Sequence, residues 1–287
     1  MQISVGILSA LVAMLCWGIA DFLTSIPSRK IGSLKTLFWS NILSLIPAAV
    51  MLIIFSEQLN ISITNVLLLT FGALLLTFGS SNFLRSLEVG EISIVTPISA
   101  SFSIVTIMLG ILILRERLFV HQFVAVFTIV LGIILGSTNL RKFKNLHTVK
   151  GVKESLVALV CWGIYFFILG LVSKTMDYIS LFVFSGLIAS PFQIGYPLIK
   201  QEKPRWTDLK TKNILVILLF NTLIYTLAWS AVTYGVNHEK ISLVTPVSSL
   251  YPLITVILAT IFYKEKLVLN QKIGILIILL GLFIINL

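Results

Sequence analysis

Apolar residues follow one another in long continuous runs along this chain, and short polar clusters separate the runs. A helix that rises about 1.5 Å per residue crosses a hydrocarbon core of about 30 Å in about 20 residues. Strands could cross only as a closed barrel of alternating polarity, which continuous apolar runs lack. The runs predict ten membrane-spanning helices, at residues 3–25, 36–55, 63–84, 92–114, 119–138, 152–172, 179–199, 212–234, 241–263 and 271–286.

Polar or turn-forming clusters mark the predicted breaks, among them residues 27–30 and 87–91. The longest joint, residues 141–151, is basic and hydrophilic, and we interpret it as a linker between two halves, 1–140 and 152–287. The first span could instead be a cleaved signal peptide. It lacks a positively charged start and a small-residue cleavage site, so we expect it to be retained.

The two halves repeat one another. The sequence Ile-Ser-Ile-Val-Thr-Pro-Ile-Ser at residues 92–99 returns 149 residues later as Ile-Ser-Leu-Val-Thr-Pro-Val-Ser, and the Cys-Trp-Gly-Ile of residues 16–19 returns 145 residues later. Such matches at a nearly fixed offset indicate a duplicated structural unit. Because each unit has five spans, an odd number, the second enters the membrane from the opposite side. Inverted repeats are typical of secondary transporters, whose site lies near the midplane.

Composition supports a membrane environment, and the distribution of charge indicates the orientation of the chain in the membrane. Hydrophobic residues make up 57% of the chain and charged residues 11%, with mean hydropathy +1.05, whereas soluble domains carry about 25% charged residues. We therefore expect an all-α polytopic protein of the cell membrane with the lipid bilayer as a partner. Loops on the side of both termini carry 4 Lys and Arg, and loops on the other side carry 17. The positive-inside rule places both termini outside the cytoplasm, so the net charge of +10 reflects topology and does not indicate nucleic-acid binding.

The Trp-Gly pair of the first helix, the Thr-Pro-x-Ser start of the fourth and its Arg/Lys-Glu-Arg/Lys-Leu end resemble the EamA repeat, and they occur twice in order. Over its whole length the chain resembles the ten-helix members of the drug/metabolite transporter superfamily. The resemblance implies a carrier of small metabolites, an exporter of amino acids or similar solutes by the nearest analogy. It also implies a central cavity lined by the first, third and fourth helices of each half. Many proteins of this kind are thought to have cytoplasmic termini, opposite to the charge count.

Asp21 is the acidic residue that lies well inside a predicted span. Carboxylates at membrane depth are costly and often bind a cation or a proton. The alternative is that Asp21 reaches the interface or caps the polar turn that follows it. Trp17 and Trp162 occupy matching mid-span positions beside glycines. We expect both rings, with Tyr165, to line the substrate cavity; packing between helices is the alternative.

Prolines in the fourth spans predict helix kinks, one in the first half and two in the second: Pro97, Pro246 and Pro252. A kink frees backbone groups, and four neighbouring side chains would then form a polar floor for substrate: Thr96, Ser99, Thr245 and Ser248. Proline near a helix start is also simply tolerated. The remaining expected substrate-binding residues are Asn82, Arg85, Trp229 and Tyr251.

Ion pairing is the alternative for the charged residues near span ends. Arg85 could hold an anionic group or pair with Glu88 one turn on. Glu116 and Glu265, each flanked by basic residues, are expected to form salt bridges that fix a loop.

Other function classes find little support. The two cysteines, Cys16 and Cys161, have no acidic or His neighbours at ligand spacing, so we expect neither a disulfide nor a metal site. The sequence has no nucleotide-binding or hydrolase motif, so we expect no enzyme and no cofactor. A flippase for lipid-linked sugars or another intramembrane envelope protein remains the alternative to a metabolite carrier. One chain can form its own cavity, as a monomer or within a homodimer.

Overall fold

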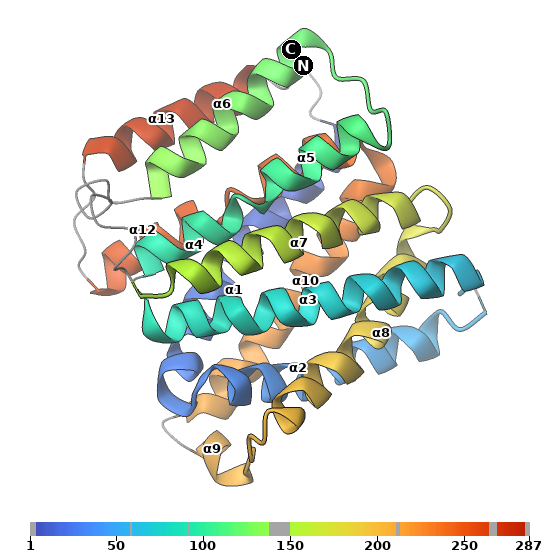
Figure 1. Ribbon diagram of the computed structural model, residues 1–287, viewed down its shortest axis with the longest axis vertical. Coiled ribbons are helices and arrows are strands. Elements are labelled where there is room, and N and C mark those ends of the chain that lie inside the picture. Colours follow the sequence, from blue (N-terminus) through green and yellow to red (C-terminus); the bar gives the residue numbers. More distant parts are fainter. Residues whose placement is uncertain are drawn as a thin grey trace.

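The computed structural model describes residues 4–57, 59–90, 92–137, 150–210, 213–263 and 269–284. Within these ranges the regular structure is entirely helical, and Figure 1 shows the helices lying side by side. They are α1 (Val5–Ile31), α2 (Ser33–Ile54), α3 (Ile63–Val89), α4 (Ile92–Ala100), α5 (Phe102–Leu112), α6 (Val120–Ser137), α7 (Val152–Val172), α8 (Tyr178–Ile199), α9 (Trp206–Lys210), α10 (Ile214–His238), α11 (Ile241–Ser248), α12 (Tyr251–Tyr263) and α13 (Leu269–Ile284).

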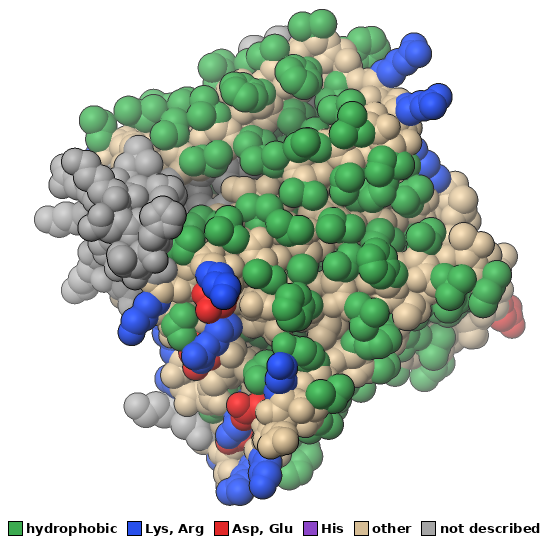
Figure 2. Space-filling model, in the orientation of Figure 1, with side chains coloured by type: hydrophobic (Ala, Val, Ile, Leu, Met, Phe, Trp, Pro, Cys, Tyr) green, Lys and Arg blue, Asp and Glu red, His purple; other side chains and the backbone are tan. Residues whose placement is uncertain are grey.

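Seven helical segments in the described ranges are long and apolar enough to cross a membrane: α1, α2, α3, α7, α8, α10 and the α11–α12 stretch Ile241–Leu258. With α4–α5, α6 and α13 they make the ten predicted spans. Large apolar side chains such as Ile53, Phe127 and Leu223 are exposed on the outside of the bundle. Figure 2 shows hydrophobic side chains covering its visible face, with most Lys and Arg at the end that holds α9. The basic end is the name used below for that end; the terminal end is the opposite one, where both termini lie (Figure 1).

Helices α1 and α3 continue past their predicted ends. The predicted break at residues 27–30 is wrong, because α1 runs through Pro27 to Ile31 and stops at Gly32, whose φ of +94° suits glycine. Arg29 holds this last turn by donating to the carbonyls of Leu87 and Gly90. The polar cluster at 27–30 is thus packed against the end of α3 rather than placed in a loop.

The fourth span of each half is broken rather than bent. In the first half α4 ends at Ala100 and α5 begins at Phe102; in the second half Ser249 and Leu250 separate α11 from α12. Each break lies about one turn after the proline that the sequence singles out, Pro97 or Pro246. The side chain of Pro97 lies outside the described part of the structure. Pro252 lies in the first turn of α12, where its missing N–H disturbs no helical bond, so it does not kink a continuous helix.

The two halves interleave. The first helix of each half packs along the third helix of the other, α1 along α10 and α7 along α3. The fifth helices, α6 and α13, pack against each other (Figure 1). Here Gly132 faces Ile278 and Gly281 faces Ile129, two contacts related by the 149-residue repeat. Because the strongest contacts run between the halves, neither half forms a core of its own.

Two glycines let the first helix of each half approach the broken fourth span of the other. A Cβ added to Gly18 would overlap the Cβ of Ile254, and one added to Gly163 would lie 2.5 Å from the Cβ of Val105. At this distance Thr255 Oγ1 donates to the Gly18 carbonyl at 3.1 Å. The equivalent bond joins Thr106 Oγ1 to the Gly163 carbonyl at 2.9 Å. Small residues and hydroxyl bonds of this kind hold helices together in membranes.

We predict that Gly18→Ala and Gly163→Ala each destabilise the folded protein. The added methyl cannot fit without moving a helix, and overpacking of this kind costs about 1–3 kcal/mol. The matched control is Gly195→Ala, because a Cβ at Gly195 meets nothing within 4 Å. Thermal unfolding in detergent, followed by tryptophan fluorescence, should give lower melting temperatures for the two test variants only. Equal melting of Gly163→Ala and Gly195→Ala would show that the close approach does not matter.

Candidate functional site

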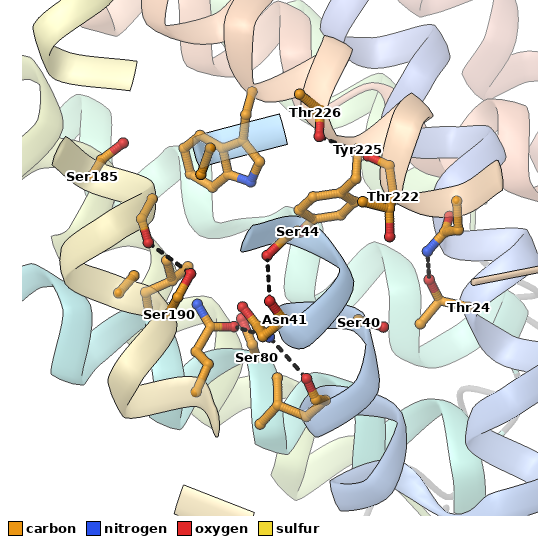
Figure 3. A pocket seen from close by; sticks show the side chains of 18 of the residues that line it. Thr24, Ser40, Asn41, Ser44, Ser80, Ser185, Ser190, Thr222, Tyr225 and Thr226 are labelled. Carbon is orange, nitrogen blue, oxygen red and sulfur yellow. Dashed lines mark hydrogen bonds between the residues drawn. The ribbon is translucent and has the colours of Figure 1, made fainter. Parts of the chain in front are cut away.

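A cavity of about 170 Å³ lies between the two halves, and Figure 3 shows part of its wall. It is lined from the first half by α1, α2 and α3 and from the second half by α7, α8 and α10. Most of its lining residues fall near the middle of the helices, while Ala48 and Phe182 lie nearer the terminal end. Asp21 and Thr24 lie in the second half of α1, which ends at the basic end.

The second helix of each half supplies a polar wall that the sequence interpretation missed. These side chains are Ser40, Asn41 and Ser44 on α2 and Ser185, Ser190 and Gln193 on α8. Asn41 Nδ2 donates to Gln193 Oε1 at 3.1 Å and so joins the two helices. The signal that could have found this wall is the recurrence of Ser, Asn and Gln at spacings of three to five residues within apolar spans.

A hydrogen bond from a buried side-chain amide crosses the opposite wall. Asn221 Nδ2 on α10 donates to Thr24 Oγ1 on α1 at 2.8 Å (Figure 3), while Asn221 Oδ1 has no protein partner. The hydroxyls of Thr222 and Thr226 donate hydrogen bonds to backbone carbonyls one turn back on α10. The wall therefore offers an amide oxygen for hydrogen bonding, whereas the two threonine protons are already used.

A second, smaller cavity of about 30 Å³ adjoins the first, and we call it the aromatic recess. The two cavities share Asp21, Leu76, Trp162, Tyr225 and Trp229. The other residues that line the recess are Trp17, Phe102, Phe166 and Tyr251. These nine residues come from the first, third and fourth spans of each half, as the resemblance implies. The main cavity differs, because the second spans line it in place of the fourth.

The rings of the recess meet mostly at right angles. Trp17 contacts Trp229 and Tyr251 at centroid distances of 5.8 and 6.2 Å with interplanar angles of 79° and 80°. Trp162 contacts Phe102 at 6.1 Å and 89°. Phe102 and Tyr251 are related by the 149-residue offset, so each tryptophan meets the same ring position of the other half. Edge-to-face packing fixes the rings and directs their faces along several directions.

Asp21 lies at the junction of the two cavities. Its side chain is buried, with 7% exposure, and no ion pair is found for it in the described ranges. No described Lys, Arg, His or Glu lines either cavity, so among the described lining residues Asp21 is the acidic side chain. Tyr165 lies in the main cavity, on the α7 turn that carries Trp162. The predicted residues Trp17, Asp21, Trp162, Tyr165, Trp229 and Tyr251 thus come together around the two cavities.

Other predicted substrate-binding residues lie elsewhere. The side chains of Thr96, Ser99, Thr245 and Ser248 are fully buried but line neither cavity. Three of them return their hydroxyls to carbonyls of their own helix, as Thr245 does to Ile241 at 2.8 Å. These residues occupy the helical turns before each break, and that part of the fourth span does not line either cavity. The expected polar floor is not formed in this structure.

The polar residues near the end of α3 also lie away from the cavities. Asn82 Nδ2 donates to the Phe78 carbonyl of its own helix. Arg85 is exposed and pairs with Glu88 at 2.8 Å, which is the ion-pair alternative. Neither residue is placed to touch a molecule in the described cavities.

Polar contacts close the terminal end between the halves. Glu116, after α5, accepts hydrogen bonds from the backbone N–H and the hydroxyl of Ser242, at the start of α11, at 3.3 and 2.5 Å. Lys240 Nζ donates to the Arg117 carbonyl at 2.7 Å. The expected salt bridge of Glu116 with its flanking basic residues is therefore wrong, because this carboxylate bonds the other half. Glu265 lies outside the described residues.

Comparison with known proteins places this geometry in a family. The model of the EamA-like transporter family matches residues 4–138 and again residues 150–287. An uncharacterized protein of Methanocaldococcus jannaschii, MJ1333.1, is 34% identical over 134 residues, which are 94% of that protein and 46% of this chain. A protein of known crystal structure shares the fold with a TM-score of 0.73 and 12% identity, over 98% of this chain and 96% of its own.

The family match covers nearly the whole chain in two consecutive copies, and each copy coincides with one set of five spans. The interleaved inverted repeats and the cavity between them are what such a transporter requires. This protein belongs to the EamA-like transporter family.

Proposed function

We propose that this protein is a secondary transporter that exports a small metabolite across the cell membrane by alternating access between its repeats. One observation carries the proposal: a cavity lined by both halves lies near the middle of the helices, while bonds between the halves close the terminal end. A carrier caught facing one side should have this asymmetry, because its site is open to one face at a time.

Contacts that the repeat makes equivalent differ in extent, which supports the same interpretation. In the described residues α5 packs against α11 more extensively than α4 packs against α12. Likewise α3 packs against α8 more extensively than α2 against α10. Exchanging the conformations of the two repeats would open the terminal end and close the basic end, and this exchange is the transport step we propose.

Orientation follows from charge. Of the 21 Lys and Arg residues, 17 belong to loops of the basic end, so we place that end in the cytoplasm and both termini outside. The cavity then loads from the cytoplasm in this state, as an exporter requires. Both walls of the cavity come from one chain, so a monomer is sufficient for this cycle, with a homodimer as the alternative.

Cavity size favours a solute as small as an amino acid or a related compound. A volume of about 170 Å³ with hydroxyl and amide groups on several walls suits a small polar molecule. A flippase for lipid-linked sugars would need a cationic group for the phosphate. The described lining has none, so this alternative lacks support.

The orientation predicts which loops are reached from outside. In a background with Cys16→Ala and Cys161→Ala, a cysteine from Glu57→Cys should react with a membrane-impermeant maleimide on intact cells. A cysteine from Lys203→Cys should react only after the membrane is opened. Both positions are exposed, at the terminal and basic ends respectively. The reverse pattern would place both termini in the cytoplasm.

Transport itself is tested first by ligand stabilisation, because a ligand that binds the folded state raises its melting temperature with concentration. A panel of amino acids, amines, nucleosides and sugars on detergent-purified protein should yield a stabilising compound from the first two groups. Labelled compound should then undergo counterflow in proteoliposomes. Stabilisation by polyprenyl or glycolipid compounds alone would contradict the proposal and favour the flippase.

Closing the terminal end permanently should stop that counterflow. In the cysteine-free background, Glu116→Cys with Ser242→Cys joined by a short bifunctional methanethiosulfonate should abolish the flux, because these two positions must separate in the outward-open state. Dithiothreitol should restore it. The two single variants, treated alike, are the controls. Undiminished flux in the linked protein would show that this contact does not open during transport.

A further inference from the structure

We propose that the ligand of this site is a small organic cation whose ammonium group lies beside Asp21 in the aromatic recess. The inference rests on the proposed transport function, since it names the class of compound carried. It narrows the metabolites of amino-acid size to amines and quaternary ammonium compounds, which share the ammonium chemistry.

The first argument is a buried carboxyl group that has no counter-charge. Asp21 is 7% exposed, and the ion pairs formed by the described side chains, Lys35–Asp208 and Arg85–Glu88, lie outside both cavities. A carboxyl group removed from water stays ionised only when a counter-charge or several hydrogen bonds compensate it, and otherwise it takes up a proton. The protein supplies neither to Asp21 in the described ranges. A cationic ligand would supply the missing charge.

The second argument is the wall around that carboxylate. Seven of the nine residues that line the recess are aromatic. Trp17, Trp229 and Tyr251 meet at nearly perpendicular planes, as the walls of a box do. Ring faces attract cations through their quadrupoles, and cages of this type recognise ammonium groups that are too methylated to donate hydrogen bonds. A carboxylate inside an aromatic box is therefore complementary to an ammonium group.

The fold does not require an acid at position 21. The first helices of the two halves align as Cys-Trp-Gly-Ile-Ala-Asp and Cys-Trp-Gly-Ile-Tyr-Phe, which puts Phe166 at the position equivalent to Asp21. Both residues line the recess. Phe166 packs there by stacking on Trp229 at 5.8 Å and 6°. Since a phenyl ring satisfies the packing in one half, the carboxylate in the other half is explained better by a ligand than by the architecture.

Size determines how such a ligand would be seated. The recess, at about 30 Å³, has room for about two water molecules, whereas the main cavity offers about 170 Å³. The two cavities meet at Asp21, Tyr225 and Trp229. A primary ammonium head therefore fits the recess, whereas a trimethylammonium head lies beside Asp21 where the two cavities meet. The rest of either molecule remains in the main cavity against the hydroxyls and amides of α2 and α8.

The charge of the lining predicts discrimination between cations and zwitterions. A zwitterion would bring a carboxylate into cavities where the described residues offer it no Lys, Arg or His. The same cavities already contain Asp21. A compound with an ammonium group and no carboxylate should therefore bind more tightly than one that carries both.

Three compounds test this on the detergent-purified full chain: choline, its uncharged isostere 3,3-dimethylbutan-1-ol, and glycine betaine. Melting temperature against concentration gives an apparent Kd for each. We expect choline to bind at least about tenfold more tightly than the other two, because the ring faces and Asp21 act on its charge. Ethanolamine and tetramethylammonium distinguish a primary from a quaternary ammonium. The proposal would be overturned if the isostere bound as tightly as choline. It would also be overturned if choline, ethanolamine and tetramethylammonium all failed to bind.

Variants locate the binding. Asp21→Asn keeps the shape of the side chain and removes its charge, so the preference for choline over its isostere should fall to about one. Glu57→Gln is the matched control, because it removes an exposed carboxylate at the terminal end and should leave the preference unchanged. An undiminished preference in Asp21→Asn would contradict the role of this residue. The comparison of choline with its isostere in the unaltered protein needs no variant to fold.

Counterflow separates the two proposals. Choline that binds through Asp21 but shows no counterflow in proteoliposomes would support the cation site and contradict the transport function. Counterflow of an uncharged or zwitterionic solute, unaffected by Asp21→Asn, would support the transport function and overturn the cation site.

Discussion

The close approach of helices at Gly18 and Gly163 is the constraint on which the rest of this structure depends. Apolar side chains gain little by leaving lipid for other apolar side chains, so helices in a membrane associate through tight packing and hydrogen bonds. At both glycines the missing side chain lets a threonine of the opposite half bond a helix carbonyl, Thr255 to Gly18 and Thr106 to Gly163. The same two contacts set the position of each tryptophan beside the broken fourth span.

Because the first helix of each half packs against helices of the other half, residues of both halves line the cavity. Each first helix is held by the other half's third and fourth spans, so the residues that follow Trp17 and Trp162 project into the space between the repeats. The second helices are then left to close the cavity from the side, and Asn41 and Gln193 join them there. In the transport cycle proposed above, a central contact of this kind would let the halves rock without separating.

Much of the site could be predicted from residues that are unusual in their setting. An acid or a tryptophan in the middle of an apolar span stands out, and Asp21, Trp17 and Trp162 do lie at the cavities. Serine and threonine do not stand out in the same way, because their hydroxyls can bond the carbonyl one turn back. Thr245 does so and faces away from both cavities, whereas Ser40 and Ser185 line the main cavity. Helix rotation decides between these cases, and packing sets the rotation.

The sequence by itself determined the ten spans, the duplication and the inversion, because length and hydropathy must match the bilayer and an odd number of spans reverses the second copy. The sequence did not predict that α1 ends at Gly32, because Pro27 is the stronger helix-breaking signal. The helix continues past Pro27, and the hydrogen bond from Arg29 to the Leu87 carbonyl holds its last turn. Only the tertiary structure decided which polar residues share a cavity and that Glu116 bonds Ser242 across the halves. Those pairings depend on the distances between helices, which no local pattern of residues specifies.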